Sequence, residues 1–495
     1  MNSSALSRRK VLGGMAAAVV GWSAATQSWA TAAEVTGGAT VAALPPLDGQ
    51  LETSPASVAS FSKDFGNLVT ATPWAVLRPG SVQDIVKMVN YARANALKIA
   101  MNGRSGTGTD LESHSCYGQA AVPGGISIDA RGLSKVCSIS STSAVVEAGV
   151  TWAQLTDAAL AQDKTPPALT DYLHLSVGGT LSVGGVGGTV QKYGLQVDTV
   201  QSVDVVTGDG QLVTASSSTR PDLFNAVLAG GGQAGIIVRA KIKLIPAPAR
   251  ALVFSLFYND LATYLADQEK LLTDGRFGGQ VGEMPRRPDD SGWRYKLEAV
   301  AYYSSAKAPD RAALLAGLRD DRASAVIEDF TYRDYTFRLD AFEAYLKEGD
   351  YWGQPKPWLS LFLPASRTKA FMDQVAAELT PGDLGGGFLL VYPYRTSKLT
   401  RPLAVQPNES VGYLFDLLRF PAPGATDIQR MLDQNRRLYD KAVALGAKRY
   451  LVGAIPGMTP AEWKQHFGSR WEAFVNAKRR YDPANILTPG QGFFS

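Results

Sequence analysis

The amino-acid sequence predicts an α+β protein built from more than one domain. With 495 residues, the chain is too long for a single hydrophobic core. Segments with strand-like patterning alternate with segments that carry apolar residues at helical spacing, and this mixture favours α+β over a plain parallel α/β sheet. The composition also changes along the sequence, because 21 of the 49 glycines lie between Gly103 and Gly235.

The first domain is expected to begin near Leu51 and to mix strands with helices. Residues 74–78 are extended and stop at a Pro-Gly turn, and residues 82–97 carry apolar side chains at helical spacing. Two apolar runs joined by residues 208–210 predict a β-hairpin. Further strands are expected at 98–101, 125–130, 144–150, 200–207, 211–215 and 235–244, and further helices at 152–163 and 222–228. Glycine weakens such elements, so its abundance here needs a reason, and close approach of the backbone to a large cofactor is one.

A second domain is expected from about residue 251 to 442. Glycine becomes rarer there, aromatic residues are common, and long helix-like stretches appear at 261–272 and 309–319. We interpret this segment as a domain that covers the glycine-rich one. The remaining residues, 448–495, include a helix predicted at 460–477.

The N-terminus resembles a twin-arginine export signal. Arg8 and Arg9 precede a weakly apolar stretch, 11–22, and small residues then lead to a cleavage site expected after Ala30. The apolar stretch is short and rich in glycine and alanine, which disfavours a membrane helix; a generic signal peptide is the remaining alternative. Residues 1–30 are therefore expected to direct the protein to the periplasm or outside the cell, with 31–50 as a linker and no later membrane span.

Charge and cysteine content exclude several classes of protein. Without residues 1–30 the protein has 46 basic and 45 acidic residues, a balance that argues against nucleic acid as a partner. Cys116 and Cys137 do not form a metal-ligand pattern, and we interpret them as small apolar fillers rather than a disulfide. With only three histidines, no metal site is expected.

Two glycine-rich loops are candidates for phosphate binding. The first follows a short predicted strand and has the wrong spacing for a nicotinamide-type fingerprint, yet it suits a nest of backbone N–H groups around a pyrophosphate. The second combines glycines with hydroxyl donors. An ordinary surface turn competes for the first loop, and interdomain packing competes for the second. The candidate residues are Gly103, Arg104, Ser105 and Gly106 in the first loop, and Gly178, Gly179, Thr180, Ser182 and Gly185 in the second.

Asp171 and His114 are the candidates for chemistry. Asp171 directly precedes the second loop, and a carboxylate beside a cofactor can accept a proton from a substrate amine or alcohol, although a turn or capping role is the simpler interpretation. His114 follows the first loop, where its imidazole could bond covalently to a flavin. His174 and His466 are interpreted as ordinary, partly buried, hydrogen-bonded histidines.

Four motifs, in order, resemble the cytokinin dehydrogenase family of vanillyl-alcohol-oxidase (PCMH) type flavoproteins. The pattern His-Ser-x-x-Gly-Gln is matched at 114–119, and Asp-Tyr-Leu followed by Val-Gly-Gly-Thr-Leu-Ser is matched within 171–182. The pattern Pro-Trp-Leu-x-Leu-Phe-x-Pro is matched at 357–364, and the C-terminal pattern at 466–491.

The resemblance implies a two-lobed FAD-binding domain, 51–246 and 445–495, with an α+β substrate (cap) domain, 247–444, inserted between the lobes. It implies FAD attached to His114 and oxidation of the C–N bond in the substituent of N6-substituted adenines, with hydride passing to the flavin and the imine hydrolysing. Asp171 would accept the amine hydrogen, Gln491 would lie near the flavin, and Trp358 would face the ring. The cofactor-binding residues added by the resemblance are Ser115, Gln119 and Ile237.

Two departures from the family leave alternatives open. About seven extra residues separate the first glycine loop from His114, so the loop either bulges outward or the covalent link is lost; the first is favoured because the following residues remain in register. Glu283 is only a weak match to the family's acidic purine contact. An oxidase of the same fold acting on an alcohol, sugar or aromatic substrate, and a non-catalytic periplasmic flavin- or purine-binding protein, therefore stay possible. The electron acceptor, oxygen or a quinone, is also open.

Overall fold

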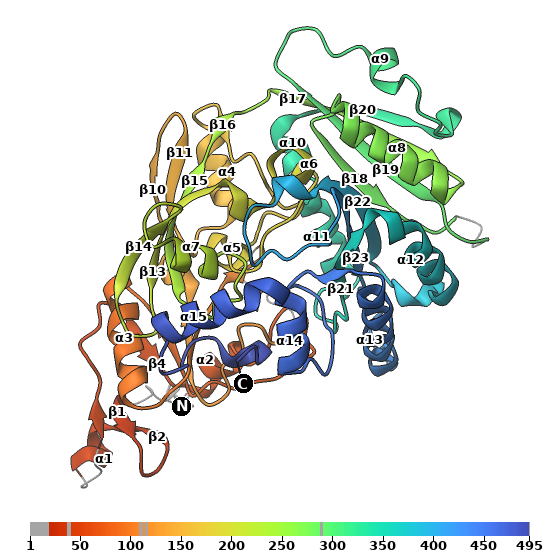
Figure 1. Ribbon diagram of the computed structural model, residues 1–495. Coiled ribbons are helices and arrows are strands. Elements are labelled where there is room, and N and C mark those ends of the chain that lie inside the picture. Colours follow the sequence, from red (N-terminus) through yellow and green to blue (C-terminus); the bar gives the residue numbers. More distant parts are fainter. Residues whose placement is uncertain (1–18, 37–40, 108–111, 114–116, 288–290, 495) are drawn as a thin grey trace, which may run out of the picture.

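The computed structural model describes residues 19–36, 41–107, 112–113, 117–287 and 291–494, and it confirms the α+β class (Figure 1). Three sheets carry most of the molecule. Two of them belong to the glycine-rich part of the sequence, and the third belongs to the aromatic-rich part.

The first sheet has four strands in the order β4 (Gln50–Glu52), β5 (Ala75–Arg78), β9 (Ile126–Asp129), β6 (Ile99–Asn102). Strands β5, β9 and β6 are parallel. Helix α3 (Val82–Ala94) follows β5 and buries Ile85, Met88 and Val89 in the same core cluster as Ile99. The helix expected at 82–97 therefore forms, and the sheet ends where the first glycine loop starts.

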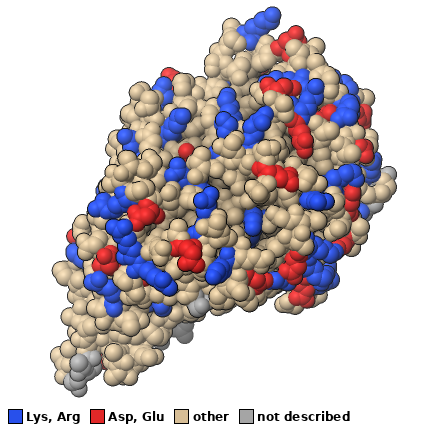
Figure 2. Space-filling model, in the orientation of Figure 1, with Lys and Arg blue, Asp and Glu red and all other residues tan. Residues whose placement is uncertain are grey.

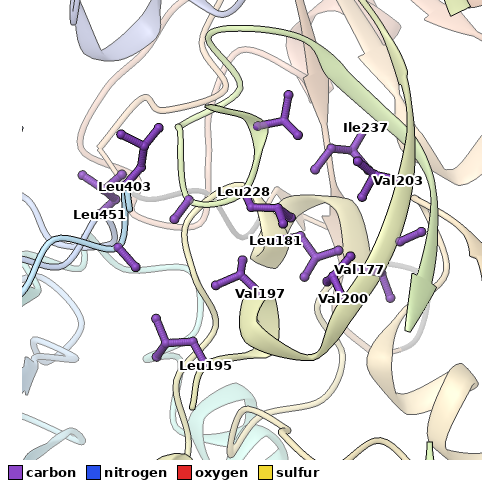
Figure 3. Close-up of a cluster of buried hydrophobic side chains, with 14 of the residues drawn as sticks. Val177, Leu181, Leu195, Val197, Val200, Val203, Leu228, Ile237, Leu403 and Leu451 are labelled. Carbon is purple, nitrogen blue, oxygen red and sulfur yellow. The ribbon is translucent and has the colours of Figure 1, made fainter. Parts of the chain in front are cut away.

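The second sheet is antiparallel and has five strands, in the order β10 (Val136–Ile139), β11 (Ser143–Glu147), β15 (Ile236–Lys243), β13 (Val200–Val206), β14 (Leu212–Ser216). The predicted hairpin is the β13–β14 pair. Helices α4 (Trp152–Leu160), α5 (Val177–Leu181) and α7 (Pro221–Val227) accompany this sheet. Figure 3 shows Val177 and Leu181 of α5 packed toward Val203 and Ile237 of the sheet. This packing fixes the second glycine loop.

The third sheet has eight strands in the order β20 (Val326–Thr331), β17 (Arg250–Tyr258), β19 (Tyr295–Tyr303), β18 (Gly279–Glu283), β22 (Phe388–Arg395), β23 (Val411–Leu418), β21 (Leu359–Pro364), β24 (Lys448–Arg449). Helices α8 (Leu261–Asp274), α12 (Ala365–Glu378) and α13 (Ile428–Ala444) cover its outer face (Figure 1). Because side chains alternate along a strand, Leu389 and Val391 face these helices while Leu390 and Tyr392 face the first two sheets.

Other elements lie outside these three sheets and the helices already named. They are β7 (Arg104–Ser105), β8 (Glu112–Ser113), β12 (Lys164–Thr165), β16 (Ile245–Pro246), α2 (Pro55–Ser60), α6 (Val190–Tyr193), α9 (Arg311–Leu315), α10 (Tyr332–Thr336), α11 (Leu339–Glu348), α14 (Pro460–Phe467) and α15 (Trp471–Tyr481). None of the helices in the described residues is both long enough and apolar enough to cross a bilayer.

The N-terminal segment differs from the expectation that structure begins near Leu51. Strands β1 (Val19–Ser23), β2 (Ser28–Thr31) and β3 (Ala42–Ala43) form a small sheet, and α1 (Ala32–Thr36) lies within the expected linker. Trp22 and Trp29 pair across β1 and β2, and Trp22 stacks on Trp74 with ring centroids 4.6 Å apart. Contact between aromatic side chains orders a segment whose composition resembled a linker.

Three further expectations need correction. The helix expected at 309–319 is only the short α9, which ends at Leu315. The helix expected at 460–477 is divided into α14 and α15, because Gly468 takes a positive φ of 52° between them. Cys137 is exposed rather than a buried filler, and Cys116 lies outside the described residues.

On the face seen in Figure 2, basic and acidic side chains are interspersed, and the end formed by β1–β3 carries few charges.

Candidate active site

A cavity of about 630 Å³ lies between the third sheet and the two smaller sheets. Its size is within the range of cofactor and ligand sites. The glycine-rich domain contributes one wall, and this wall includes Thr488 from the C-terminal segment. The cap domain contributes the opposite wall, which holds Trp358 and most of the charged groups.

The first wall is made largely of glycines that have little or no room for a larger residue. A Cβ on Gly103 would lie 2.1 Å from Ser176 Oγ, and one on Gly178 would lie 2.7 Å from the Ala148 Cβ. Gly231 and Gly232 also line the cavity and take positive φ angles of 62° and 74°. At these positions glycine is required by close contact with the protein's own atoms, which is the packing account that the sequence left open for the second loop.

The hydroxyl groups of the second loop are used within the protein. Thr180 Oγ1 accepts a hydrogen bond from Trp152 Nε1 at 2.6 Å and donates to the Val177 carbonyl, and Ser182 Oγ donates to the Gly178 carbonyl at 2.8 Å. These hydroxyls were expected to donate to phosphates. They instead hold α5 in place, although both residues line the cavity.

Asp171 lies in the cavity beside a cation that the sequence did not identify. Arg338, between α10 and α11, donates from Nη2 to Asp171 Oδ1 at 2.9 Å. Burial raises the pKa of Asp171, and the positive charge of Arg338 opposes that rise. The negative charge of Glu298, which is 3.4 Å from Arg338, raises the pKa further. Asp171 is thus a carboxyl group whose proton affinity is set by a balance of burial and charge.

The charges continue along the cap wall in alternation. After Glu298 come Lys296, 4.0 Å from it, and Glu283, 3.2 Å from Lys296. Tyr335 donates its hydroxyl to Glu298 at 2.8 Å. Each carboxylate in this series lies beside a cation, which reduces the cost of placing charge at a mainly apolar cavity.

Aromatic side chains close the cavity around Trp358. Its indole Nε1 donates to the Arg419 carbonyl at 2.9 Å, which fixes the ring. Phe65 and Phe420 contact it edge to face, at centroid distances of 5.4 and 5.6 Å. Tyr172 also lines the cavity and donates its hydroxyl to Glu343 at 2.6 Å. These rings give the cavity the shape and polarity that suit an aromatic ligand.

The structure brings most of the residues singled out in the sequence to this cavity. Those that line it are Gly103, Gln119, Asp171, Gly178, Gly179, Thr180, Ser182, Ile237, Glu283 and Trp358. His114 and Ser115 lie outside the described residues. His174 is an ordinary, partly buried histidine, 3.0 Å from Asp340 Oδ1. His466 is buried as expected, but its Nε2 has no hydrogen-bond partner among the described residues.

Three other candidates, Arg104, Gly106 and Gly185, do not line the cavity. Arg104 turns away, donating to the Ser60 carbonyl and lying 4.5 Å from the Phe61 ring centroid. Ser105 lies in β7, and the Gly106 N–H donates to the His174 carbonyl at 3.0 Å. Gly185 packs on Gln196, since a Cβ there would lie 2.0 Å from Gln196 Oε1.

Gln491 lies behind the cavity wall rather than in it. Its Nε2 donates to the Tyr117 carbonyl at 3.2 Å, and its Oε1 accepts from Arg449 at 3.3 Å. It therefore supports the segment that follows His114 and leads to Gln119, which does line the cavity.

Sequence reasoning missed five charged residues that line the cavity: Lys296, Glu298, Arg338, Glu343 and Asp416. Arg338 gave no signal, because only the fold brings it to Asp171. Glu298 and Asp416 could have been found, since each interrupts an apolar strand, in β19 and β23 respectively. A charged residue inside a buried strand requires a reason. Among the described residues, no cluster of three or more His, Cys, Asp or Glu side chains is suited to a metal ion.

Comparison with known proteins gives consistent matches over most of the sequence. A family model described as "Cytokinin dehydrogenase 1, FAD and cytokinin binding" matches residues 283–494, and one described as "FAD binding domain" matches 73–216. An uncharacterized oxidoreductase of the fasciation locus of Rhodococcoides fascians is 37% identical over 90% of this protein and 99% of its own length. Cytokinin dehydrogenase 1 of Oryza sativa subsp. japonica is 34% identical over 93% and 96%, and cytokinin dehydrogenase 2 of Arabidopsis thaliana is 33% identical over 90% and 94%.

The matched models identify FAD as the cofactor, and the cavity fits it. Gly103, Gly178, Gly231 and Gly232 line one wall without side chains that would fill the cavity. Gln119 and Ile237 lie on the same wall. Asp171 and the cap residues face them, so a substrate would lie between FAD and the cap domain.

Proposed function

Since the chain belongs to the cytokinin dehydrogenase family of FAD-dependent oxidoreductases, we propose that it oxidises an amine, most suitably an N6-substituted adenine, at the carbon attached to the exocyclic nitrogen. One observation carries this proposal: Asp171 lines the cavity beside Arg338, with its Oδ1 2.9 Å from the guanidinium. A carboxylate held ionised next to a substrate is suited to accept a proton from an amine N–H.

In this proposal Asp171 and its neighbours control the proton of the reacting amine. Bound FAD supplies the acceptor for the hydride that leaves the adjacent carbon. Arg338 favours the ionised form of Asp171 against the burial that raises its pKa, and the ionised carboxylate can accept the N–H hydrogen. Burial and Glu298 raise the pKa of Asp171, so the carboxyl group can also retain the proton while the substrate loses hydride.

The cap wall would bind the ring of the substrate. Trp358, fixed by its bond to the Arg419 carbonyl, provides an aromatic surface. We propose that Glu283, at the far end of the charge series and 3.2 Å from Lys296, contacts the purine. A carboxylate there can accept hydrogen bonds from ring N–H groups.

Two further features belong to the proposal. We propose that His114 is bonded covalently to FAD, since Gly118 and Gln119 remain in position after the extra residues and Gln119 lines the cavity. Acid denaturation of the holoenzyme should then leave the flavin with the precipitated protein, whereas His114→Ala should release it.

We also propose export to the periplasm through Arg8 and Arg9, with oxygen or a quinone accepting the electrons.

The function is tested by adding N6-isopentenyladenine to the holoenzyme without oxygen and following the flavin absorbance. We expect the absorbance to bleach, and Asp171→Asn to slow the bleaching by roughly 10²–10⁴-fold, as for the loss of a general base. Asp157→Asn is the matched control, because Asp157 forms a similar pair with Arg333 on the surface. Bleaching by alcohols alone would favour an alcohol oxidase, and bleaching by no donor would favour a binding protein.

A further inference from the structure

Asp416 differs from the other carboxylates of the cavity, because no cation accompanies it. Asp171 pairs with Arg338, Glu283 and Glu298 lie beside Lys296, and Glu343 is 2.7 Å from Lys347. Among the described carboxylates that line the cavity, Asp416 alone forms no ion pair. The residue is 7% exposed, and its Oδ1 has no hydrogen-bond partner within the described residues.

The register of the third sheet places Asp416 in a continuous row of side chains. Glu283 pairs with Leu390, Leu390 pairs with Asp416, and Asp416 pairs with Ser360. Paired residues on neighbouring strands point to the same face, and all four line the cavity. With about 4.8 Å between strands, the Asp416 position lies roughly 10 Å from that of Glu283. The two acids are therefore at different parts of one ligand-sized space.

The surroundings of Asp416 are polar but not fully satisfied. Ser360, directly opposite, is 1% exposed, and its Oγ also has no hydrogen-bond partner in the described part of the protein. Burial raises the pKa of Asp416 to about 7, and the charge of Asp171 adds to that rise. The Ser360 hydroxyl lies near enough to oppose it as a donor, although no well-formed hydrogen bond joins the two side chains. The charge of Asp171 thus acts on Asp416. Because Asp171 is the proposed base, a ligand group bound at Asp416 lies near the bond that is oxidised.

A buried carboxyl group with a free oxygen is costly unless a partner arrives. A hydroxyl group can donate to Asp416 Oδ1 and accept from Ser360 Oγ in one position. The hydrocarbon next to it would contact Leu390, Leu418 and Tyr392, which line the same wall.

Resting on the proposed function, we infer that Asp416 and Ser360 form a subsite that selects substrates whose N6 substituent carries a hydroxyl group near the C–N bond that is oxidised. In this arrangement Glu283 contacts the purine ring, and Asp416 contacts the N6 substituent. Asp416 is a specificity residue in this view, while Asp171 remains the base.

The test compares two probes that differ only in a hydroxyl next to the carbon that is oxidised, N6-butyladenine and N6-(2-hydroxybutyl)adenine. Their dissociation constants are measured on the anaerobic holoenzyme from changes in flavin absorbance, and kcat/KM is measured with an artificial electron acceptor. We expect the natural enzyme to prefer the hydroxylated probe by roughly 3- to 10-fold, the value of one hydrogen bond to a carboxyl group that is only partly ionised near neutral pH. Asp416→Leu should reduce the ratio to about one, and Asp416→Asn should retain part of it.

Three controls keep the outcomes distinct. Ser360→Ala should lower the preference with little effect on folding, and Asp373→Leu changes an exposed aspartate on α12 that should leave the preference unchanged. FAD content and melting temperature show whether Asp416→Leu folds. Equal affinities of the natural enzyme for the two probes, binding of neither, or an unchanged preference in Asp416→Leu would overturn the inference. Selective binding of the hydroxylated probe without turnover would support the subsite but contradict the proposed function. Turnover of both probes without a preference would support the proposed function but contradict the subsite.

Discussion

The ionisation of Asp171 shows how single residues set the chemistry of this site. Burial raises its pKa, and the cation of Arg338 lowers it. A base must be deprotonated to accept the amine hydrogen, so the reaction should fail as the pH falls through the pKa of Asp171. Arg338 also lies over the Tyr335 ring, 4.3 Å from its centroid, which holds the guanidinium in place.

Replacing Arg338 should move this pH dependence. In Arg338→Gln the pKa of Asp171 rises, so the acid limb of the flavin reduction rate should shift to higher pH. Below that pKa, the rate should fall by about tenfold for each unit of the shift. Stopped-flow reduction measured over a range of pH would show this. Arg333→Gln, which removes a surface cation from the same segment, should leave the limb where it is. If the rate fell while the acid limb of the pH profile stayed at the same pH, Arg338 would support the fold of the site without setting the pKa of Asp171.

At the scale of elements, the C-terminal helix and tail hold the strand that leads to the first glycine loop. Lys478 of α15 is buried, and its Nζ lies 2.6 Å from Asp482 Oδ2 and donates to the Gln233 carbonyl at 3.0 Å. Asp482 in turn accepts from the N–H groups of Ile486 and Leu487. This tail extends the first sheet beside β6, because the Ile99 N–H donates to the Ile486 carbonyl at 2.9 Å.

Lys478→Met should therefore destabilise the protein through the tail. Removing one partner of a buried ion pair leaves the other unpaired, at a cost of about 3–5 kcal/mol. The midpoint of urea unfolding should fall, and the preparation should contain less FAD, since β6 leads to Gly103. Arg479→Met is the matched control, because Arg479 is the next residue and is exposed. Equal unfolding midpoints for the two variants would contradict this role.

The elements with regular patterns could be predicted from the sequence, and those defined by distant contacts could not. Helix α3 and the β13–β14 hairpin were expected from periodicity and turn residues. The β1–β3 sheet was missed because it depends on stacking of Trp22 on Trp74. In the site, Asp171 and the second glycine loop were found through motifs. Arg338 was missed because it is 167 positions from Asp171, and no local pattern records that contact.

At the scale of the whole molecule, one buried lysine helps to hold the two domains together. Lys356, in the cap segment before β21, is fully buried, and its Nζ donates to the Phe65 carbonyl of the other domain at 3.0 Å. It also donates to the Gln354 carbonyl at 2.9 Å, and its backbone N–H donates to the Gly66 carbonyl at 2.7 Å. Phe65 and Trp358, on either side of this contact, both line the cavity.

Lys356→Met should loosen this contact and affect the site from a distance. Methionine has nearly the same length as lysine, but the carbonyls of Phe65 and Gln354 lose a buried donor, at about 1–3 kcal/mol for each group left unsatisfied. We expect earlier unfolding in urea and a higher KM, because Trp358 and Phe65 no longer have fixed positions, while the pH limb set by Asp171 and Arg338 stays unchanged. Circular dichroism and steady-state kinetics would measure these effects. Lys369→Met on α12, where the lysine is exposed, is the control. Unchanged stability and KM in Lys356→Met would show that the domains are held by other contacts.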